Sequence, residues 1–154
     1  PLHSYSTEID EAFEDYSKKF DRIVGIHIRH GDYRKWQSGR HFFHVEEYAH
    51  ATKEAIDSPC NNTLFVVVSD EDIQKGQLTG LPHTINSSSP IKDLYTLSKC
   101  DIIVGPFSTF NIWASFFGKV PRFEIRRVGS TPKATSAGTS TNLEEIIDYK
   151  QQDE

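Results

Sequence analysis

The sequence lacks several features that would place it in a specialised class of protein. It has no methionine, only two cysteines among its 154 residues, and no apolar run near the ~18 residues that a membrane-spanning helix needs. Two cysteines are too few for a disulfide scaffold, and no segment has the pattern of a signal peptide. A chain without methionine that begins at Pro1 is expected to be a processed or truncated piece of a longer protein.

The sequence also lacks an excess of positive charge. Its 17 Lys and Arg against 22 Asp and Glu give a formal net charge of −5. Bulk electrostatics therefore do not favour a nucleic-acid partner, so any anion must be held by local groups. Two formal glycosylation triplets, Asn61-Asn62-Thr63 and Asn86-Ser87-Ser88, are common by chance. The compartment, cytoplasmic or Golgi-lumenal, and the oligomeric state therefore stay open.

What the sequence does contain is an alternation of strand and helix patterns. Largely apolar runs predict strands buried on both faces of a sheet, over 23–28, 64–68, 102–104 and 120–125, and a short third strand is expected at 84–86. Apolar residues at helical spacing predict helices over 8–20, 45–56, 91–99 and 110–117. Such an alternation predicts an α/β fold, a Rossmann-like parallel sheet with flanking helices.

The predicted domain covers residues 1–128, and residues 129–154 are expected to follow it as a flexible Ser/Thr/Gly-rich segment with a short C-terminal helix. The flexible part is expected over 129–141 and the helix over 143–149. The strand at 120–125 is expected at the edge of the sheet, because Pro121 cannot donate to a central ladder.

Polar side chains gather where three of the predicted strands end. They are His27, Arg29, His30 and Asp32 after the first strand, Ser69 and Asp70 after the second, and Ser108 and Thr109 after the fourth. Because the carboxyl ends of parallel strands share one edge, where open α/β sheets bind ligands, these groups are expected to form one site.

The chemistry of these groups suits a nucleoside diphosphate. Ser108 and Thr109 begin a predicted helix, whose hydroxyls, N–H groups and dipole favour phosphate. Arg29 adds a charge-assisted contact to the same anion. A carboxylate such as Asp70 suits ribose hydroxyls or the edge of a base. The pattern therefore predicts a nucleotide-diphosphate site.

Purely structural interpretations remain open for most of these residues. Ser69, Asp70, Asp101, Ser108 and Thr109 are typical helix caps. His27 suits a buried, hydrogen-bonded histidine, and the aromatic side chains of Trp36, Phe42 and Phe43 suit packing. The two His-x-x-His spacings, His27/His30 and His41/His44, do not predict a metal site. Residues i and i+3 at the end of a strand point to different faces, and zinc needs three or four ligands with firm geometry.

One short motif points to a different reaction. Arg29-His30-Gly31 resembles the Arg-His-Gly signature of histidine phosphatases, in which the histidine is the nucleophile. That family has a further arginine and a proline where this chain has Tyr33 and Lys35. A histidine-phosphatase-like hydrolase is therefore the weaker alternative.

Three segments together resemble the α-1,2-fucosyltransferases and their α-1,6- and protein O-fucosyltransferase relatives, closest to the α-1,2 type. Residues 27–33 resemble their His-x-Arg-Arg-Gly-Asp-Tyr motif, and residues 65–71 resemble a strand that ends in Ser-Asp-Asp. Residues 93–115 resemble a third motif that runs from Asp-Leu through Ser-x-Cys-Asp to Ser-Thr-Phe and Trp-Ala. Three motifs in order at compatible spacing are a more specific signal than any one of them.

The resemblance implies the donor-binding half of a GT-B glycosyltransferase that transfers fucose from GDP-fucose, with inversion and without a metal or other cofactor, to a glycan or other hydroxyl acceptor. It places Arg29 on the diphosphate, Ser108 and Thr109 near the phosphates, and Ser69 and Asp70 near the nucleoside. His27 is also expected near the donor.

Two positions within the first motif leave questions open. His30 stands where the family has its second arginine, and an imidazole with a pKa near ~6.5 is mostly neutral at pH 7. Asp32 is the nearest candidate for a catalytic base, with orientation of the Arg29 loop as the alternative. A non-catalytic nucleotide- or glycan-binding module is the main competing interpretation of the whole chain.

Overall fold

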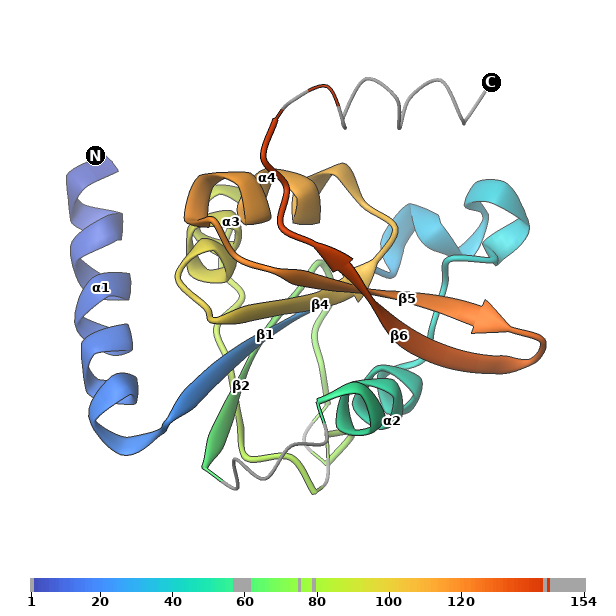
Figure 1. Ribbon diagram of the computed structural model, residues 1–154, viewed down its shortest axis with the longest axis horizontal. Coiled ribbons are helices and arrows are strands. Elements are labelled where there is room, and N and C mark those ends of the chain that lie inside the picture. Colours follow the sequence, from blue (N-terminus) through green and yellow to red (C-terminus); the bar gives the residue numbers. More distant parts are fainter. Residues whose placement is uncertain (1, 57–61, 75, 79, 143, 145–154) are drawn as a thin grey trace.

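The structure is a computed structural model, and it describes residues 2–56, 62–74, 76–78, 80–142 and 144. These residues form one sheet with the strand order β3-β2-β1-β4-β5-β6 (Figure 1). The strands are β1 (Arg22–Ile28), β2 (Thr63–Ser69), β3 (His83–Ile85), β4 (Ile102–Pro106), β5 (Arg122–Val128) and β6 (Thr131–Gly138). The first five are parallel and β6 is antiparallel, so the predicted Rossmann-like α/β class is confirmed.

Four α-helices and two short 3₁₀ helices accompany this sheet in the described ranges. They are α1 (Leu2–Lys19), α2 (Val45–Ala55), α3 (Pro90–Ser98), α4 (Thr109–Gly118), η1 (Gly31–Arg34) and η2 (Trp36–Gly39). Helix α2 lies on one side of the sheet, and α1, α3 and α4 lie on the other (Figure 1). None of the helices in these ranges combines the length and the apolar character that a membrane crossing requires.

The central strand β1 distributes its side chains to both layers. Val24, Ile26 and Ile28 pack with the core beneath α2, whereas Ile23 packs with Phe13 of α1 on the opposite face. Between them, Gly25 lets α3 approach the sheet. A Cβ at Gly25 would lie 2.8 Å from Leu97 Cδ2 and 2.9 Å from Cys100 Sγ. The continuous apolar pattern of the strand is therefore explained by burial on both faces.

The strand order places a topological switch point beside β1. The chain builds β2 and β3 on one side of β1 and then returns to build β4 and β5 on the other. The connections after β1 and β4 therefore leave the sheet in opposite directions, which opens a crevice at their carboxyl ends. Arg29 follows β1 directly, and Ser108 is the second residue after β4.

The last part of the sheet differs from the sequence-based expectation. Strand β5 does not lie at the edge, because β6 pairs with it over Arg122–Val128. Pro121 precedes β5, and its carbonyl accepts the Ile103 N–H at 3.0 Å, so its missing donor does not disturb the ladder. Residues 131–138, which were expected to be flexible, form β6 instead. The predicted helix over 143–149 lies outside the described residues, except for Glu144.

The signal for β6 is the turn that precedes it. Gly129 has φ +67° and, with Ser130, joins Val128 to Thr131 as a two-residue hairpin loop. A Gly-Ser pair between β-branched residues is typical of such hairpins. The Ser/Thr/Gly-rich composition of the strand obscured this pattern.

Candidate functional site

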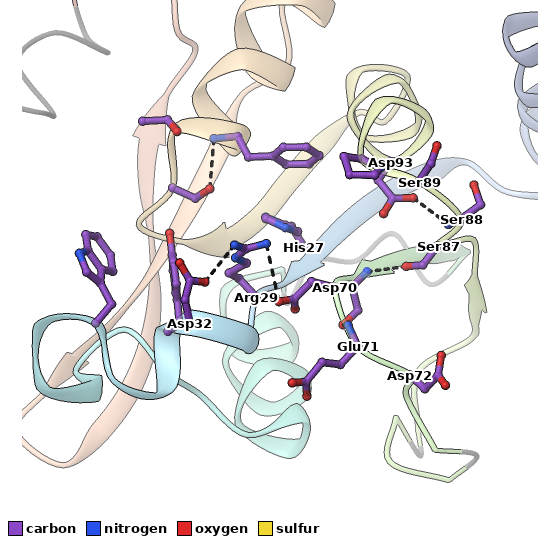
Figure 2. Close-up of a pocket in the computed structure, with 17 residues that line it drawn as sticks. His27, Arg29, Asp32, Asp70, Glu71, Asp72, Ser87, Ser88, Ser89 and Asp93 are labelled. Carbon is purple, nitrogen blue, oxygen red and sulfur yellow. Dashed lines mark hydrogen bonds and ion pairs between the residues drawn. The ribbon is translucent and has the colours of Figure 1, made fainter.

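A pocket of about 1010 Å³ lies at the carboxyl edge of the sheet. Loops after β1, β2, β3 and β4 form its walls, so four separate segments of the chain meet there (Figure 2). Of the predicted site residues, seven line it: His27, Arg29, Asp32, Ser69, Asp70, Ser108 and Thr109. The eighth, His30, does not line it.

Arg29 lies between two carboxylates on the pocket wall (Figure 2). Its Nη2 donates to Asp32 Oδ1 at 2.9 Å, and its Nη1 lies 3.6 Å from Asp70 Oδ2. The guanidinium carbon lies 5.6 Å from the centre of the Tyr33 ring. Because the Tyr33 hydroxyl donates to the Phe107 carbonyl at 2.7 Å, that ring is fixed to the segment after β4. The arginine is therefore oriented before any ligand arrives.

Asp70 supports the loop that carries Arg29. Its Oδ1 accepts the backbone N–H of His30 at 2.8 Å. A Cβ at Gly31 would lie 2.6 Å from Asp70 Oδ2, so the carboxylate occupies space that only glycine leaves free. The Gly31 of the motif is therefore explained by the close approach of Asp70 to the backbone.

His30 points away from the pocket and into the protein. Its Nε2 donates to the Phe43 carbonyl at 2.7 Å, and its ring centre lies 4.7 Å from that of Phe42. Its Nδ1 lies 3.5 Å from a Glu71 carboxylate oxygen. The sequence-based expectation placed His30 at the diphosphate, but the structure orients it to the opposite side of the loop from Arg29. Consecutive residues leaving a strand point in opposite directions, which explains this difference.

His27 is a buried titratable group of the pocket. Burial lowers its pKa from 6.5 to about 4, although a hydrogen bond with Asn111 opposes the shift. Its Nδ1 lies 2.7 Å from Asn111 Oδ1, and its ring packs 4.8 Å from that of Phe110. His27 is therefore neutral at pH 7. It is both the buried, hydrogen-bonded histidine of the structural interpretation and a residue of the pocket.

Both serines predicted at the site accept backbone hydrogen bonds, and one of them caps a helix. Ser108 is the N-cap of α4, and its Oγ accepts the Phe110 N–H at 3.1 Å. Ser69 Oγ accepts the Glu71 N–H at 3.2 Å. The helix-cap interpretation is therefore confirmed for Ser108, whereas Ser69 stabilises a bend after β2 with no helix following it in the described residues before β3. The α4 N-terminus nevertheless faces the pocket, since Ser108, Thr109 and Phe110 all line it.

The charge of the pocket is mainly negative. Of the lining residues that the structure describes, Arg29 alone has a permanent positive charge, and the acidic ones are Asp32, Asp70, Glu71, Asp72 and Asp93. The Arg34 guanidinium, which hydrogen-bonds Glu71, holds the pKa of that carboxyl below its usual range. Within the described lining, an anion can therefore rely on Arg29 and the α4 N-terminus.

Residues after β3 also line the pocket, and the sequence pattern did not identify them as part of the site. Ser87, Ser88 and Ser89 lie between β3 and α3, and Asp93 follows them in α3. Asp93 Oδ1 accepts the Ser88 N–H at 3.1 Å, and burial raises the pKa of its carboxyl. The available signal was the position of this serine run after a predicted strand of the same sheet.

Of the three aromatic residues for which the sequence suggested packing, Trp36, the first residue of η2, lines the pocket. It also packs against Tyr33, with ring centres 4.9 Å apart, and against His41 at 5.0 Å. Phe42 and Phe43 pack instead, as the structural interpretation predicted, with Phe43 fully buried under α2. Among the described residues, no group of three or more His, Cys, Asp or Glu side chains is arranged to hold a metal ion.

Comparisons with known proteins agree with this architecture. A structure of NodZ α-1,6-fucosyltransferase, co-crystallised with GDP, matches with a TM-score of 0.60 at 19% identity, over 89% of this chain and 48% of that one. A structure of an Arabidopsis thaliana FUT1 variant in complex with GDP matches with a TM-score of 0.54 at 16% identity, over 90% of this chain and 38% of that one.

The chain thus spans about half the length of NodZ and less of FUT1, and the likeness to both shows a shared fold. No curated protein matches the sequence. The profile of the family described as glycosyl transferase family 11 matches residues 7–121, which is most of the chain. This match and the shared fold confirm the resemblance to the fucosyltransferase superfamily that the three motifs indicated. The chain belongs to glycosyl transferase family 11.

Proposed function

We propose that this chain is the nucleotide-sugar-binding domain of an inverting glycosyltransferase that transfers fucose from GDP-fucose to a hydroxyl acceptor such as a glycan. The observation that carries the proposal is the position of Arg29. In a family 11 domain, its guanidinium lines a pocket at the switch point of the sheet, as does the N-terminus of α4. A guanidinium and a helix N-terminus both favour the binding of a diphosphate. The GDP bound to the two structural neighbours supports the same assignment.

In this proposal the diphosphate lies between Arg29 and the α4 residues Ser108 and Thr109. The nucleoside extends toward the segments after β2 and β3, where Asp70 and Asp93 supply carboxylates. Carboxylates accept hydrogen bonds, and ribose hydroxyls and the N–H groups of a guanine edge donate them. Asp70 Oδ2 lies 3.6 Å from Arg29 Nη1, so in this proposal the guanidinium also offsets the charge of a carboxylate next to the phosphates.

The proposed chemistry uses Arg29 as the main catalytic side chain. Breaking the sugar–phosphate bond gives the sugar oxocarbenium character and leaves negative charge on the departing diphosphate. A preoriented guanidinium stabilises that charge more in the transition state than in the ground state. Asp32 holds the guanidinium at 2.9 Å, which supports a positioning role. Asp32 is also the nearest candidate for the base that would take the proton from the acceptor hydroxyl.

A non-catalytic nucleotide- or glycan-binding module is the second candidate. It is favoured by the mainly negative lining, because one arginine alone gives limited stabilisation of a departing diphosphate. The phosphatase alternative lacks support from the geometry. His30 would be its nucleophile, yet His30 is buried outside the pocket, with Nε2 bonded to the Phe43 carbonyl.

Calorimetric titration with GDP, GDP-fucose, GDP-mannose and UDP, with and without a chelator, tests the proposal. We expect the protein to bind GDP and GDP-fucose equally well with and without the chelator. We expect no binding of UDP. Equal binding of UDP, or binding that the chelator abolishes, would contradict it. Release of GDP from bound GDP-fucose in the presence of glycan acceptors then separates the transferase from the binding module.

A further inference from the structure

We infer that Asn111 is a positioning residue that fixes His27 as a hydrogen-bond acceptor for the ligand. The inference rests on the proposed function, because the ligand it concerns is a nucleotide sugar. It assigns a role to a buried side chain of α4 that does not itself line the pocket. It also assigns the role of hydrogen-bond acceptor to Nε2 of the His27 ring.

The orientation of the Asn111 amide is determined by its surroundings. Its Nδ2 donates to the Pro106 carbonyl at 2.9 Å, and the side chain is 2% exposed. The reverse orientation would bring two oxygen acceptors together without a hydrogen between them. Gly105 makes room for this amide, since a Cβ there would collide with it. The amide oxygen is therefore the atom that faces His27.

This orientation selects one tautomer of His27. Asn111 Oδ1 lies 2.7 Å from His27 Nδ1, and an amide oxygen only accepts hydrogen bonds. Nδ1 must therefore carry the hydrogen. The charged groups that act on the ring are Arg29, which lowers its pKa, and Asp70, which raises it, while burial outweighs both. The ring is neutral at pH 7, so Nε2 carries a lone pair.

Nε2 is the nitrogen that remains for a ligand. His27 lines the pocket between Arg29 and Asp93 (Figure 2), and none of the described residues hydrogen-bonds its Nε2. A lone pair in this position accepts from a hydroxyl or an N–H of a nucleotide sugar, and it does not bind a phosphate oxygen. His27 and Arg29, two residues apart on one strand end, therefore recognise ligand groups of opposite polarity.

Nitrogen-15 NMR of the histidine-labelled protein tests the tautomer directly, with His27→Gln to assign the signals. The expected spectrum at pH 7 has a protonated Nδ1 and an unprotonated Nε2. Saturation with GDP-fucose should shift the Nε2 signal upfield, toward the protonated range, as an accepted hydrogen bond does. A protonated Nε2 in the free protein, or no shift at saturation, would overturn the inference.

Asn111→Asp gives a second test through binding. A carboxylate beside Nδ1 stabilises the protonated ring and turns Nε2 into a donor. GDP-fucose affinity should then fall at least tenfold, whereas the exposed charge-matched control Asn142→Asp should change it less than twofold. Unchanged or tighter binding by folded Asn111→Asp would refute the assigned polarity. If that variant does not fold, the nitrogen-15 spectrum of the unaltered protein, free and saturated with GDP-fucose, still tests the inference. If the unaltered protein binds no guanine nucleotide, the proposed function fails, while the tautomer result still stands or falls by itself.

Discussion

The two sides of the loop after β1 differ sharply in environment. On the pocket side, Arg29 and Asp32 form an ion pair whose side chains are 38% and 65% exposed. On the α2 side, His30 is buried against Phe42 and donates to the Phe43 carbonyl. Residues that are neighbours in one motif thus have separate tasks. The buried side anchors the loop, and this anchoring keeps the charged side in a fixed orientation for an anion.

Replacing Arg29 should have the largest effect on the pocket side. Charged hydrogen bonds contribute ~1.5–3 kcal/mol each, so Arg29→Ala should weaken GDP binding on the order of 100-fold or more. The melting temperature should change little, because exposed ion pairs contribute only ~0–1 kcal/mol. Calorimetry and a thermal melt measure both. Arg34→Ala is the matched control, since Arg34 pairs with Glu71 and does not line the pocket. Unchanged GDP affinity of the folded Arg29→Ala variant would show that Arg29 does not bind the diphosphate.

Acid should reveal the free-energy cost of burying His27, which lies in β1 and lines the pocket. The unfolded chain takes up a proton below pH 6.5, whereas the folded protein does so only near pH 4. Stability should therefore fall as the pH drops through this window, by up to about 3 kcal/mol at ~1.4 kcal/mol per pH unit. Urea unfolding at pH 7 and pH 4.5 measures the loss, and His27→Gln should lack this part of it. If the free energy of unfolding falls equally in the two proteins between pH 7 and pH 4.5, the pKa of His27 is not lowered by folding.

Replacing His30 should give the reverse pattern to Arg29. His30→Ala leaves the Phe43 carbonyl without its donor and opens a space beside Phe42, so stability should fall by about 1–3 kcal/mol. GDP affinity of the folded variant should stay within about twofold. Urea unfolding and calorimetry on the same samples provide the comparison. A large loss of GDP affinity without a loss of stability would show that the two sides of the loop are not separate.

Replacing Asp32 should have the smallest effect on binding and stability. Its pair with Arg29 is exposed, so Asp32→Asn should change stability by less than about 1 kcal/mol. Removing a competing carboxylate from Arg29 should leave GDP affinity equal or a few-fold higher. If Asp32 instead acts as the base for the acceptor hydroxyl, the transfer rate should fall about 100-fold or more at unchanged GDP affinity. Calorimetry and a GDP-release assay distinguish the two roles.

Much of this arrangement was predictable from local patterns. The five parallel strands, the four α-helices and the position of seven predicted residues in the pocket lining follow from apolar runs and from polar residues at strand ends. Strand β6 and the pocket residues after β3 were missed. The composition of β6 is poor in strand-forming residues. The pocket segment after β3 consists of serines that are also typical of a turn, and Asp93 follows them inside a helix.

The sequence by itself determined the class of fold, the family and the edge of the sheet that carries the site, because burial periodicity and the order of motifs along the chain are local properties. Only the tertiary structure decided which of two adjacent residues, Arg29 or His30, faces the pocket, and which tautomer His27 adopts. Those outcomes depend on Asn111, Phe43 and Asp70, which lie between 13 and 84 residues away along the chain. Contacts of that range are set by how the layers pack, so no local pattern contains them.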